Sequence, residues 1–416
     1  MKKSAVIIAL LLIMLLSAGC GILYDVDDML VNPALSVQEK EIMKAVNSLS
    51  DDEVVLKYPL SGDSRLPIMF FDLDGDSAEE AVAFYSIPSE SVFSGLAVLE
   101  QEKESWLLAG CIEGSGPEIS SVRVLSGGNG ECFILVCWSS GNRDQKLASY
   151  HYGSGGLIPG IEDNCSEVIT RDFDGDGVEE ICYISSDDEN FYIKFIEGLS
   201  LDEPVYSQCR LSNRTMAVSQ LSSGQLYDGC SALFVDEATL DEKKQTEIFT
   251  LHPEEGISAL VMGDRVSGLT QRPYRSPSCH IIPASQFMSV PAASVPFDGI
   301  IDPECWTYWY GFSSDNIEFS GLSLSSADYR FDIFVPDEWA LLYHSEQDPE
   351  DAAQFNIVTN EGEKLFSLKV LYVGDSSDPD FDGYRLLQQS VNFKYYYSSS
   401  CDFSDLGFIL RNFVCY

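Results

Sequence analysis

Basic residues are scarce in this sequence. Its 25 lysines and arginines stand against 66 aspartates and glutamates, which leaves a net charge of −41. A chain with this balance repels phosphate backbones and anionic lipid by long-range electrostatics, so the composition argues against nucleic-acid binding. The simplest consequence of the acidic excess is solubility, although gathered carboxylates also attract divalent cations.

The residues on which common enzyme motifs depend are also few. The four histidines, His151, His252, His280 and His344, are scattered along the chain. No Gly-x-Ser-x-Gly, HExxH or phosphate-binding glycine loop is present. No CxxC occurs among the 12 cysteines, which argues against a zinc site. The sequence therefore gives no positive sign of a catalytic centre.

Long hydrophobic runs are missing after the first twenty residues. The one apolar stretch, 5–16, follows Lys2 and Lys3 and precedes Ser17-Ala18-Gly19-Cys20, the pattern of a secretory signal. The tetrapeptide resembles the bacterial lipobox, which implies a signal peptide over 1–19 and a lipid on the thiol of Cys20. The alternative is an ordinary secretory signal with a coincidental cysteine. Both interpretations predict an extracytoplasmic protein; the first adds a membrane anchor through Cys20.

The composition that remains is that of a folded protein. Hydrophobic residues make up 45% and aromatic residues 12%, which is enough for sizeable cores, and 416 residues suggest two or three domains. Residues 20–50 are predicted to be a tether followed by a short helix over 37–49. Ser36 with Glu39 has the form of a capping box, and Ile42 and Val46 belong to an apolar stripe at helical spacing.

From residue 51 to residue 312 short apolar runs recur every ten to fifteen residues between turn-forming clusters, which predicts antiparallel strands. Larger units begin near 70, 122, 171 and 217, a period of roughly fifty residues. That length holds four strands and is typical of the blades of a β-propeller, which closes radially. We expect a degenerate fifth repeat over 257–264 and a sixth over 278–299. The predicted fold class is mainly β, a propeller-like array of about 50-residue four-stranded repeats.

Two acidic loops, 72–80 and 172–180, lie one hundred residues apart and share one pattern. Each has carboxylates at positions one, three, five and nine, which can converge on a hard cation together with the carbonyl of position seven. The repetition favours structural calcium over a solvated hairpin, which remains the alternative. The predicted calcium ligands are Asp72, Asp74, Asp76, Ala78 and Glu80 in the first loop and Asp172, Asp174, Asp176, Val178 and Glu180 in the second.

The first loop also resembles the nucleophile motif of haloacid-dehalogenase phosphatases, with Asp72 as nucleophile and Asp74 as acid or base. We reject that interpretation on three grounds. Asp76 stands where that motif has threonine, the motif recurs at residue 172, and a strand rather than a helix follows.

Residues 51–186 resemble the VCBS/FG-GAP repeats, which are calcium-loop propeller blades. The residues that carry this resemblance are Asp72-x-Asp74-x-Asp76 with Glu80 and Asp172-x-Asp174-x-Asp176 with Glu180. The order of lipobox, helix and repeats is similar to that of a type of clostridial lipoprotein. Beyond the repeat domain of 51–312, residues 316–416 are predicted to form a small C-terminal α/β domain that weakly resembles PsbP, with a short helix over 384–392.

These features predict a cell-surface, lipid-anchored binding or scaffold protein with calcium-stabilised repeats. Its partner would be an envelope glycan or protein, since propellers present broad loop-lined faces. The alternative is an extracellular hydrolase that acts on polysaccharide with carboxylates on the propeller face. Trp306, Tyr308, Trp309 and Tyr310 precede the C-terminal domain, where such a cluster either stacks on a ligand or packs a junction.

Overall fold

The computed structural model shows a chain built mostly of antiparallel strands. The signal segment and Cys20 lie outside the described residues. No helix of the described part is long and apolar enough to cross a membrane. The structure describes residues 36–89, 91–103, 105–127, 132–141, 145–153, 156–187, 189–199, 206–252, 256–260, 270–283, 285–292, 306–374, 383–400 and 403–416.

The predicted N-terminal helix is present as α3 (Val37–Val46), continued by a 3-10 turn over Asn47–Leu49. The hydroxyl of Ser36 accepts a hydrogen bond from the amide of Glu39, whose carboxylate accepts one from the amide of Ser36. This reciprocal capping box satisfies two amides that the first helical turn leaves free.

Four sheets follow, each an antiparallel meander of four consecutive strands, so the predicted period of about fifty residues is confirmed. Blade 1 comprises β3 (Ile68–Phe71), β4 (Glu80–Ser86), β5 (Ser94–Glu102) and β6 (Ser105–Glu113). Blade 2 comprises β7 (Glu118–Ser126), β8 (Cys132–Ser139), β9 (Gln145–Gly153) and β10 (Gly156–Cys165). Blade 3 comprises β11 (Glu167–Arg171), β12 (Glu180–Ser186), β13 (Phe191–Ile196) and β14 (Tyr206–Arg210). Blade 4 comprises β15 (Thr215–Gln225), β16 (Ser231–Thr239), β17 (Lys243–His252) and β18 (Gly256–Ala259).

Three two-residue strands extend these sheets. β1 (Val55–Leu56) pairs with β4, and β19 (Arg272–Pro273) pairs with β17. β2 (Ser61–Gly62) pairs in parallel with β7 of the next blade. Gly62 has φ +104, and a Cβ there would lie 1.9 Å from the carbonyl oxygen of Val122, so this crossing between blades requires glycine.

The sheets stack face to face, which explains why the second strand of each blade is a continuous apolar run. In β4, Val82 and Phe84 belong to the core shared with blade 2, whereas Ala81 and Ala83 belong to the core shared with α3. Strand geometry places alternate side chains on opposite faces. Because both faces of an inner sheet are covered, both sets must be apolar.

A fifth sheet and a C-terminal sheet complete the chain, and the small helices α5 (Trp339–Leu342) and α6 (Phe403–Arg411) accompany them. The fifth sheet runs β20 (His280–Ile281), β21 (Met288–Ala292), β22 (Thr307–Phe312), β23 (Ile317–Ser326), β24 (Phe331–Val335) and β30 (Phe413–Cys415). The C-terminal sheet has the order β25 (Tyr343–Gln347), β26 (Gln354–Thr359), β27 (Lys364–Tyr372), β29 (Phe393–Ser399) and β28 (Arg385–Gln389).

Several expectations for this half of the chain need correction. The boundary expected between residues 312 and 316 falls in the turn of the hairpin of β22 and β23, so both sides share one sheet. The stretch expected as a helix over 384–392 contains the edge strand β28, because pairing with β29 satisfies its backbone groups in a segment too short to be a stable helix. Ile257 lies in β18, the last strand of blade 4, so no separate fifth repeat starts there. Residues 261–264 and 293–299 lie outside the described residues.

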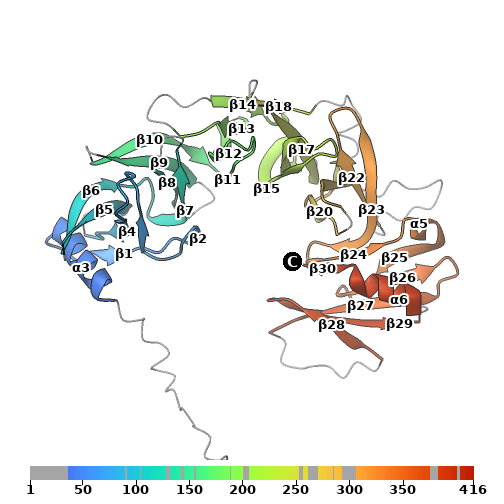
Figure 1. Ribbon diagram of the computed structural model, residues 1–416. Helices are drawn as coiled ribbons and strands as arrows, with labels where there is room; N and C mark the ends of the chain where they lie inside the picture. Colours follow the sequence, from blue (N-terminus) through green and yellow to red (C-terminus); the bar gives the residue numbers. More distant parts are fainter. Residues whose placement is uncertain are drawn as a thin grey trace, which may run out of the picture.

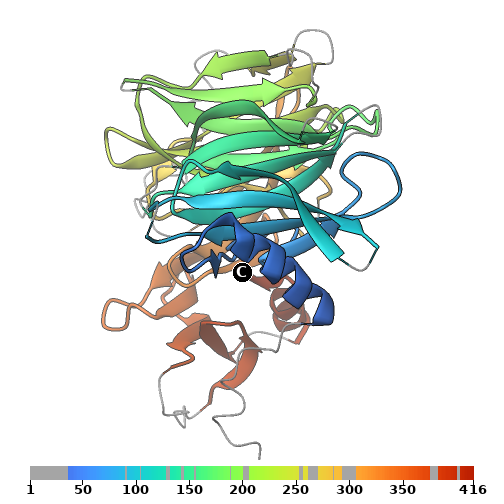
Figure 2. The same ribbon diagram turned by 90° about the vertical axis from the view of Figure 1, so that its left-hand side faces the viewer.

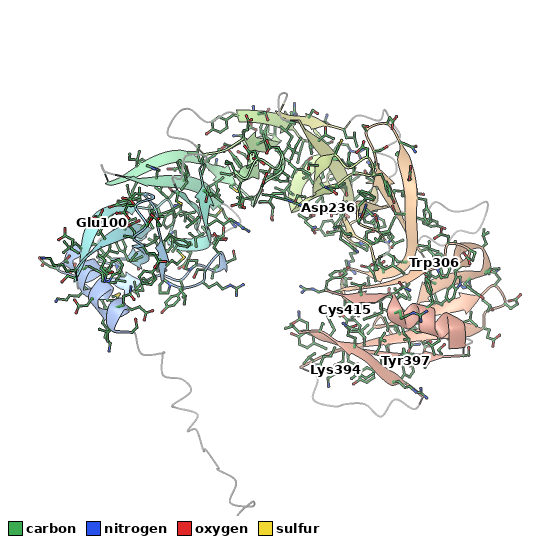
Figure 3. All side chains as sticks on the ribbon, in the orientation of Figure 1. Glu100, Asp236, Trp306, Lys394, Tyr397 and Cys415 are labelled. Carbon is green, nitrogen blue, oxygen red and sulfur yellow. The ribbon has the colours of Figure 1, made fainter. Side chains whose placement is uncertain are left out.

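The aromatic residues before the C-terminal domain pack into cores. Trp309 is fully buried with Phe334, and Trp306 packs into the core between the fifth sheet and the C-terminal sheet. Figure 3 places Trp306, Tyr397 and Cys415 in this part of the molecule. Packing, rather than ligand stacking, is therefore the role that the structure gives to these two tryptophans.

The sheets follow an open arc, with blade 1 at one end and the C-terminal sheet at the other (Figure 1). α3 lies across the outer face of blade 1 (Figure 2), where Ile42 and Val46 are fully buried. The C-terminal sheet covers the last face of the fifth sheet through a shared apolar core. The fold is thus propeller-like, but the expected radial closure is replaced by a cap at each end of the row.

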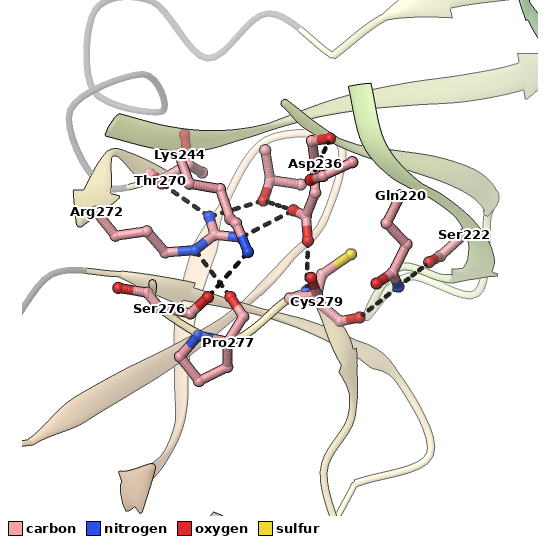
Figure 4. A network of polar contacts seen from close by, with 12 residues as sticks. Gln220, Ser222, Asp236, Lys244, Thr270, Arg272, Ser276, Pro277 and Cys279 are labelled. Atoms are coloured by element: carbon pink, nitrogen blue, oxygen red, sulfur yellow. Dashed lines mark hydrogen bonds and ion pairs between the residues drawn. The ribbon is translucent and has the colours of Figure 1, made fainter. Parts of the chain in front are cut away.

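A buried ion pair fastens the segment that links blade 4 to the fifth sheet (Figure 4). Arg272 and Asp236 have no exposed side-chain surface and lie 2.8 Å apart. Arg272 also donates to Thr246 and to the carbonyl of Pro277, and Asp236 accepts from the amide of Cys279. Since both charges are fully hydrogen-bonded, the pair can hold residues 270–279 without an unpaired buried charge.

Candidate metal centres between blades

Each acidic loop joins the first two strands of its blade and is folded by its own aspartates. In the second loop, the two carboxylate oxygens of Asp172 accept the amides of Gly175 and Gly177. Asp174 accepts the amide of Asp176, and Asp176 accepts that of Val178. These turns curl the backbone so that alternate side chains point to the inside of the loop.

The second loop brings its four predicted carboxylates together. One oxygen of each of Asp172, Asp174, Asp176 and Glu180 lies within 4.8 Å of all the others. The Glu180 side chain is buried, and its Oε2 accepts the amide of Phe173 at 2.6 Å. Its Oε1 is buried with no hydrogen-bond partner. Burial, opposed by the Phe173 amide and reinforced by the three aspartates, raises the pKa of Glu180 to about 7.

The first loop repeats this arrangement with two differences. The hydrogen bonds of Asp72, Asp74 and Asp76 to loop amides correspond one for one to those of the second loop. Asp72, Asp74 and Glu80 gather within the same 4.8 Å limit, but Asp76 is not part of that group. Ser77 takes the left-handed conformation, φ 73, where the second loop has Gly177 at φ 89. Burial is the main cause that raises the pKa of Glu80.

The ligand role of the position-seven carbonyls, those of Ala78 and Val178, stays a prediction, and the structure shows the hydrogen bonds of their amides. The amides of Ala78 and Val178 each donate to the aspartate at position five, at 2.7 Å in both loops. This bond fixes the turn just before the strand that carries Glu80 or Glu180.

Both loops contact the following blade. The carbonyl of Leu73 accepts the amide of Cys132 in β8, and the carbonyl of Phe173 accepts the hydroxyl of Ser231 in β16. Leu73 is fully buried in the core between blades 1 and 2, and Phe173 packs in the core between blades 3 and 4. The amide of the same residue donates to Glu80 or Glu180, so each cluster is tied directly to an interface between blades.

The turn of blade 4 makes the same kind of contact without an acidic cluster. Asp228 accepts hydrogen bonds from the amide and the hydroxyl of Ser314, both at 2.8 Å, and from the amide of Cys230. Burial opposes ionisation, but these hydrogen bonds outweigh it and lower the pKa of Asp228 to about 2. The amide of Tyr227 also donates to Phe312 of the fifth sheet.

Sequence reasoning missed the residues that line the loops from neighbouring strands. Glu100 of β5 accepts a hydrogen bond from the hydroxyl of Tyr152 in β9. Burial and Glu100, followed by Glu80 and Asp74, raise the pKa of Tyr152, which places its hydroxyl in the field of the first loop. No sequence motif near Tyr152 marks it as a neighbour of the first loop.

A cavity lies between blades 2 and 3, at a junction without an acidic loop. Its volume is about 460 Å³. Asp163 of β10 faces Lys194 and Tyr183, with which it makes an ion pair and a hydrogen bond of 3.0 Å. Tyr206, which is half exposed, completes one wall.

No family model matches this chain, and no curated protein matches it. Among solved structures, a functionally unknown protein from Desulfotomaculum acetoxidans is 12% identical, with a TM-score of 0.30, over 72% of this chain and 84% of its own. A periplasmic gluconolactonase from Pseudomonas aeruginosa is 13% identical, with a TM-score of 0.31, over 60% of this chain and 68% of its own. An α-L-arabinofuranosidase from Podospora anserina is 12% identical, with a TM-score of 0.23, over 62% of this chain and 87% of its own. At these TM-scores the similarities carry no argument about function, and the VCBS/FG-GAP and PsbP resemblances stay predictions.

Proposed function

We propose that the two acidic loops bind calcium and that each ion fastens one blade to the next in a cell-surface scaffold. The observation that carries this proposal is Glu180, whose Oε1 is buried without a partner beside three aspartates. A buried, unpaired carboxylate oxygen costs free energy that a bound cation would remove.

The donor set suits calcium. The cluster offers carboxylate oxygens only, and hard divalent cations prefer such ligands. Four carboxylates within 4.8 Å repel one another, and a double positive charge offsets that repulsion. Because Leu73 and Phe173 join the clusters to the interfaces between blades, ordering of a loop would also order its junction.

The proposed location agrees with this role. The signal segment and Cys20 favour an extracytoplasmic protein held to the membrane by a lipid. Extracellular modules typically bind calcium with dissociation constants on the order of 10⁻⁴–10⁻³ M. A row of sheets with loops on its rims would then present a surface to an envelope glycan or protein.

The hydrolase alternative has less support. Glu237 and Glu247 lie on adjacent strands of blade 4. Burial raises the pKa of Glu237 to about 9, and the charge of Glu247 and its hydrogen bond with Glu237 add to this effect. Glu237 is fully buried, however, so a polysaccharide could not reach it. This pair therefore does not favour hydrolysis.

The test is thermal unfolding with 10 mM calcium and with chelator. At about 10–100 times the dissociation constant, each ion should add roughly 1.4–2.7 kcal/mol to the free energy of unfolding. Asp174→Ala should remove the contribution of the second loop. Glu179→Ala removes a charge from the same loop but not from the cluster, so it should keep that contribution. Identical unfolding curves with calcium and with chelator would refute the proposal.

A further inference from the structure

The junction of blades 1 and 2 and the junction of blades 3 and 4 are equivalent position by position. In blade 1, Leu99 of β5 pairs with Ala81 of β4, and Glu100 is the next residue of β5. In blade 3, Ile196 of β13 pairs with Ile181 of β12, and Glu197 is the residue after Ile196. The two glutamates therefore lie opposite Glu80 and Glu180 in their sheets.

The same register relates the facing blades. In blade 2, His151 of β9 pairs with Phe133 of β8, and Tyr152 is the next residue of β9. In blade 4, Thr250 of β17 pairs with Ala232 of β16, and Leu251 is the next residue of β17. Tyr152 and Leu251 thus occupy corresponding places across the junction from the acidic loops. The first junction thus has a tyrosine where the second has a leucine.

At the first junction Tyr152 fills the space beside the loop. Its side chain is 3% exposed and packs in the core between blades 1 and 2. Its hydroxyl donates to Glu100, so one hydroxyl group already lies beside the first acidic cluster.

At the second junction Leu251 is too short to fill the corresponding space, and a cavity of about 160 Å³ remains. This is well above the roughly 10–15 Å³ that a single water requires. Three of the lining side chains are apolar, Phe173, Phe195 and Leu251, and three are acidic, Asp174, Glu180 and Glu197. Ser231 completes the lining, and its hydroxyl donates to the carbonyl of Phe173.

Two observations connect this cavity to the second loop. Asp174 and Glu180 line it and also belong to the cluster of four carboxylates. Glu180 is 1% exposed, and its Oε1 has no partner. An ion held by the cluster would therefore border a space that no side chain of the described residues fills.

We propose that the second junction binds a hydroxyl group of a saccharide or other neutral polyol, which ligates the ion from within this cavity. The proposal rests on the calcium function proposed above. Calcium takes six to eight oxygen ligands, so an ion with free positions exchanges water for other oxygens. At the first junction the hydroxyl of Tyr152 lies beside the loop, which shows that a hydroxyl group fits at this position.

The walls select the class of ligand. Glu197 can accept a hydrogen bond from a second hydroxyl, whereas it repels a carboxylate or phosphate. Phe173, Phe195 and Leu251 offer an apolar surface to the C–H groups of a sugar ring. A neutral polyol satisfies both requirements.

The first experiment counts water on the ion. Terbium replaces calcium, and its luminescence lifetimes in H₂O and D₂O give the number of coordinated waters in two single-loop variants, Asp74→Ala and Asp174→Ala. Because the second cluster gathers four carboxylates and the first only three, each ion is compared with itself before and after the exchange of the facing residue. We expect Leu251→Tyr to remove at least one water from the ion of the second loop, and Tyr152→Leu to add water at the first loop. Unchanged counts after both exchanges would overturn the proposal, whereas absence of terbium binding would refute the calcium function itself.

The second experiment measures binding of methyl glycosides of glucose, galactose and mannose by saturation-transfer NMR. With saturating calcium, at least one should give a signal that falls fivefold or more with chelator and in Leu251→Tyr. Tyr152→Leu, which opens the first junction, should increase the signal, so the test survives if Leu251→Tyr does not fold. Tyr206→Ala alters the larger cavity between blades 2 and 3 and should have no effect. Loss of binding in Tyr206→Ala but not in Leu251→Tyr would overturn the proposal, as would no binding of any glycoside.

Discussion

At the junction of blades 1 and 2, an acidic loop that gathers the carboxylates of Asp72, Asp74 and Glu80 reaches the next sheet. At the junction of blade 4 and the fifth sheet, a turn with one aspartate makes the equivalent contact. Asp228 binds Ser314 directly, so its charge is satisfied by donors from the protein. The carboxylates of the acidic loops accept amides of their own loop, and Glu180 keeps one oxygen unpaired. The difference agrees with the proposal that the acidic loops hold a cation, because their carboxylates face each other, whereas the carboxylate of Asp228 faces donors.

The largest loss in the free energy of unfolding should come from removing the apolar residue that packs an acidic loop against the next blade. Leu73→Ala deletes a fully buried side chain and should cost about 2–5 kcal/mol in the free energy of unfolding. Phe173→Ala should cost less, because Phe173 is partly exposed. Urea unfolding in saturating calcium measures both, and equal losses would contradict the unequal burial.

Asp332 in β24 of the fifth sheet is a buried carboxylate that belongs to neither acidic loop, and it can be compared with Glu80 and Glu180. Burial, opposed by the nearby Ser325, raises its pKa from 3.8 to about 7, and within the described residues neither of its oxygens makes a hydrogen bond of good geometry. His280 Nε2 lies 3.5 Å from the Asp332 carboxylate, and burial is the main cause that lowers the pKa of His280.

A raised carboxyl pKa means that the folded state holds the proton more tightly than the unfolded state. The free energy of unfolding should therefore fall as pH rises from about 4 to about 7 and then level off, by on the order of 4 kcal/mol at most. Asp332→Asn should remove this slope and be more stable than the parent at pH 8. Parallel pH profiles for the two proteins would show that Asp332 does not titrate in this window.

Asp228→Ala tests the junction of blade 4 and the fifth sheet, where the aspartate has donors from the protein. Loss of the hydrogen bonds from Ser314 and Cys230 should cost about 1–2 kcal/mol, a modest value because Asp228 is exposed. The stabilisation by calcium should be unchanged. Calorimetry with calcium and with chelator measures both quantities, and a smaller calcium effect in the variant would mean that the junctions are coupled.

The smallest effect should come from the one backbone difference between the acidic loops. Ser77→Gly relieves a left-handed serine and should add about 0.4–1 kcal/mol, and Gly177→Ser should remove at least as much. Thermal unfolding of the two exchanges in calcium checks the signs. If Gly177→Ser is neutral, the loops do not differ in backbone strain.

The sequence predicted the blades well because buried strands leave a strong local signal. Runs such as 81–85 and 181–184 are apolar throughout, and the acidic loops mark where the first strand ends. The capping box of Ser36 and Glu39 was equally local. The calcium ligands themselves stay a prediction, although the second loop brings its four carboxylates together.

What the sequence did not reveal depends on contacts between distant segments. Tyr152 lies 72 residues from Glu80 along the chain, and nothing near it marks it as a neighbour of the first loop. The strand β30 returns from the C-terminus to pair with β24, which no local pattern indicates. The open arc likewise depends on the packing of α3 and the C-terminal sheet against the outermost faces.

The caps at the two ends of the row have an evolutionary consequence. A closed ring accepts only the number of units that its curvature allows, whereas a row that is finished by separate pieces can gain or lose units in the middle. Residues 68–165 and 167–259 each contain one loop-bearing blade and one loop-free blade. Duplication of such a pair would lengthen the protein by a whole module without disturbing either terminus.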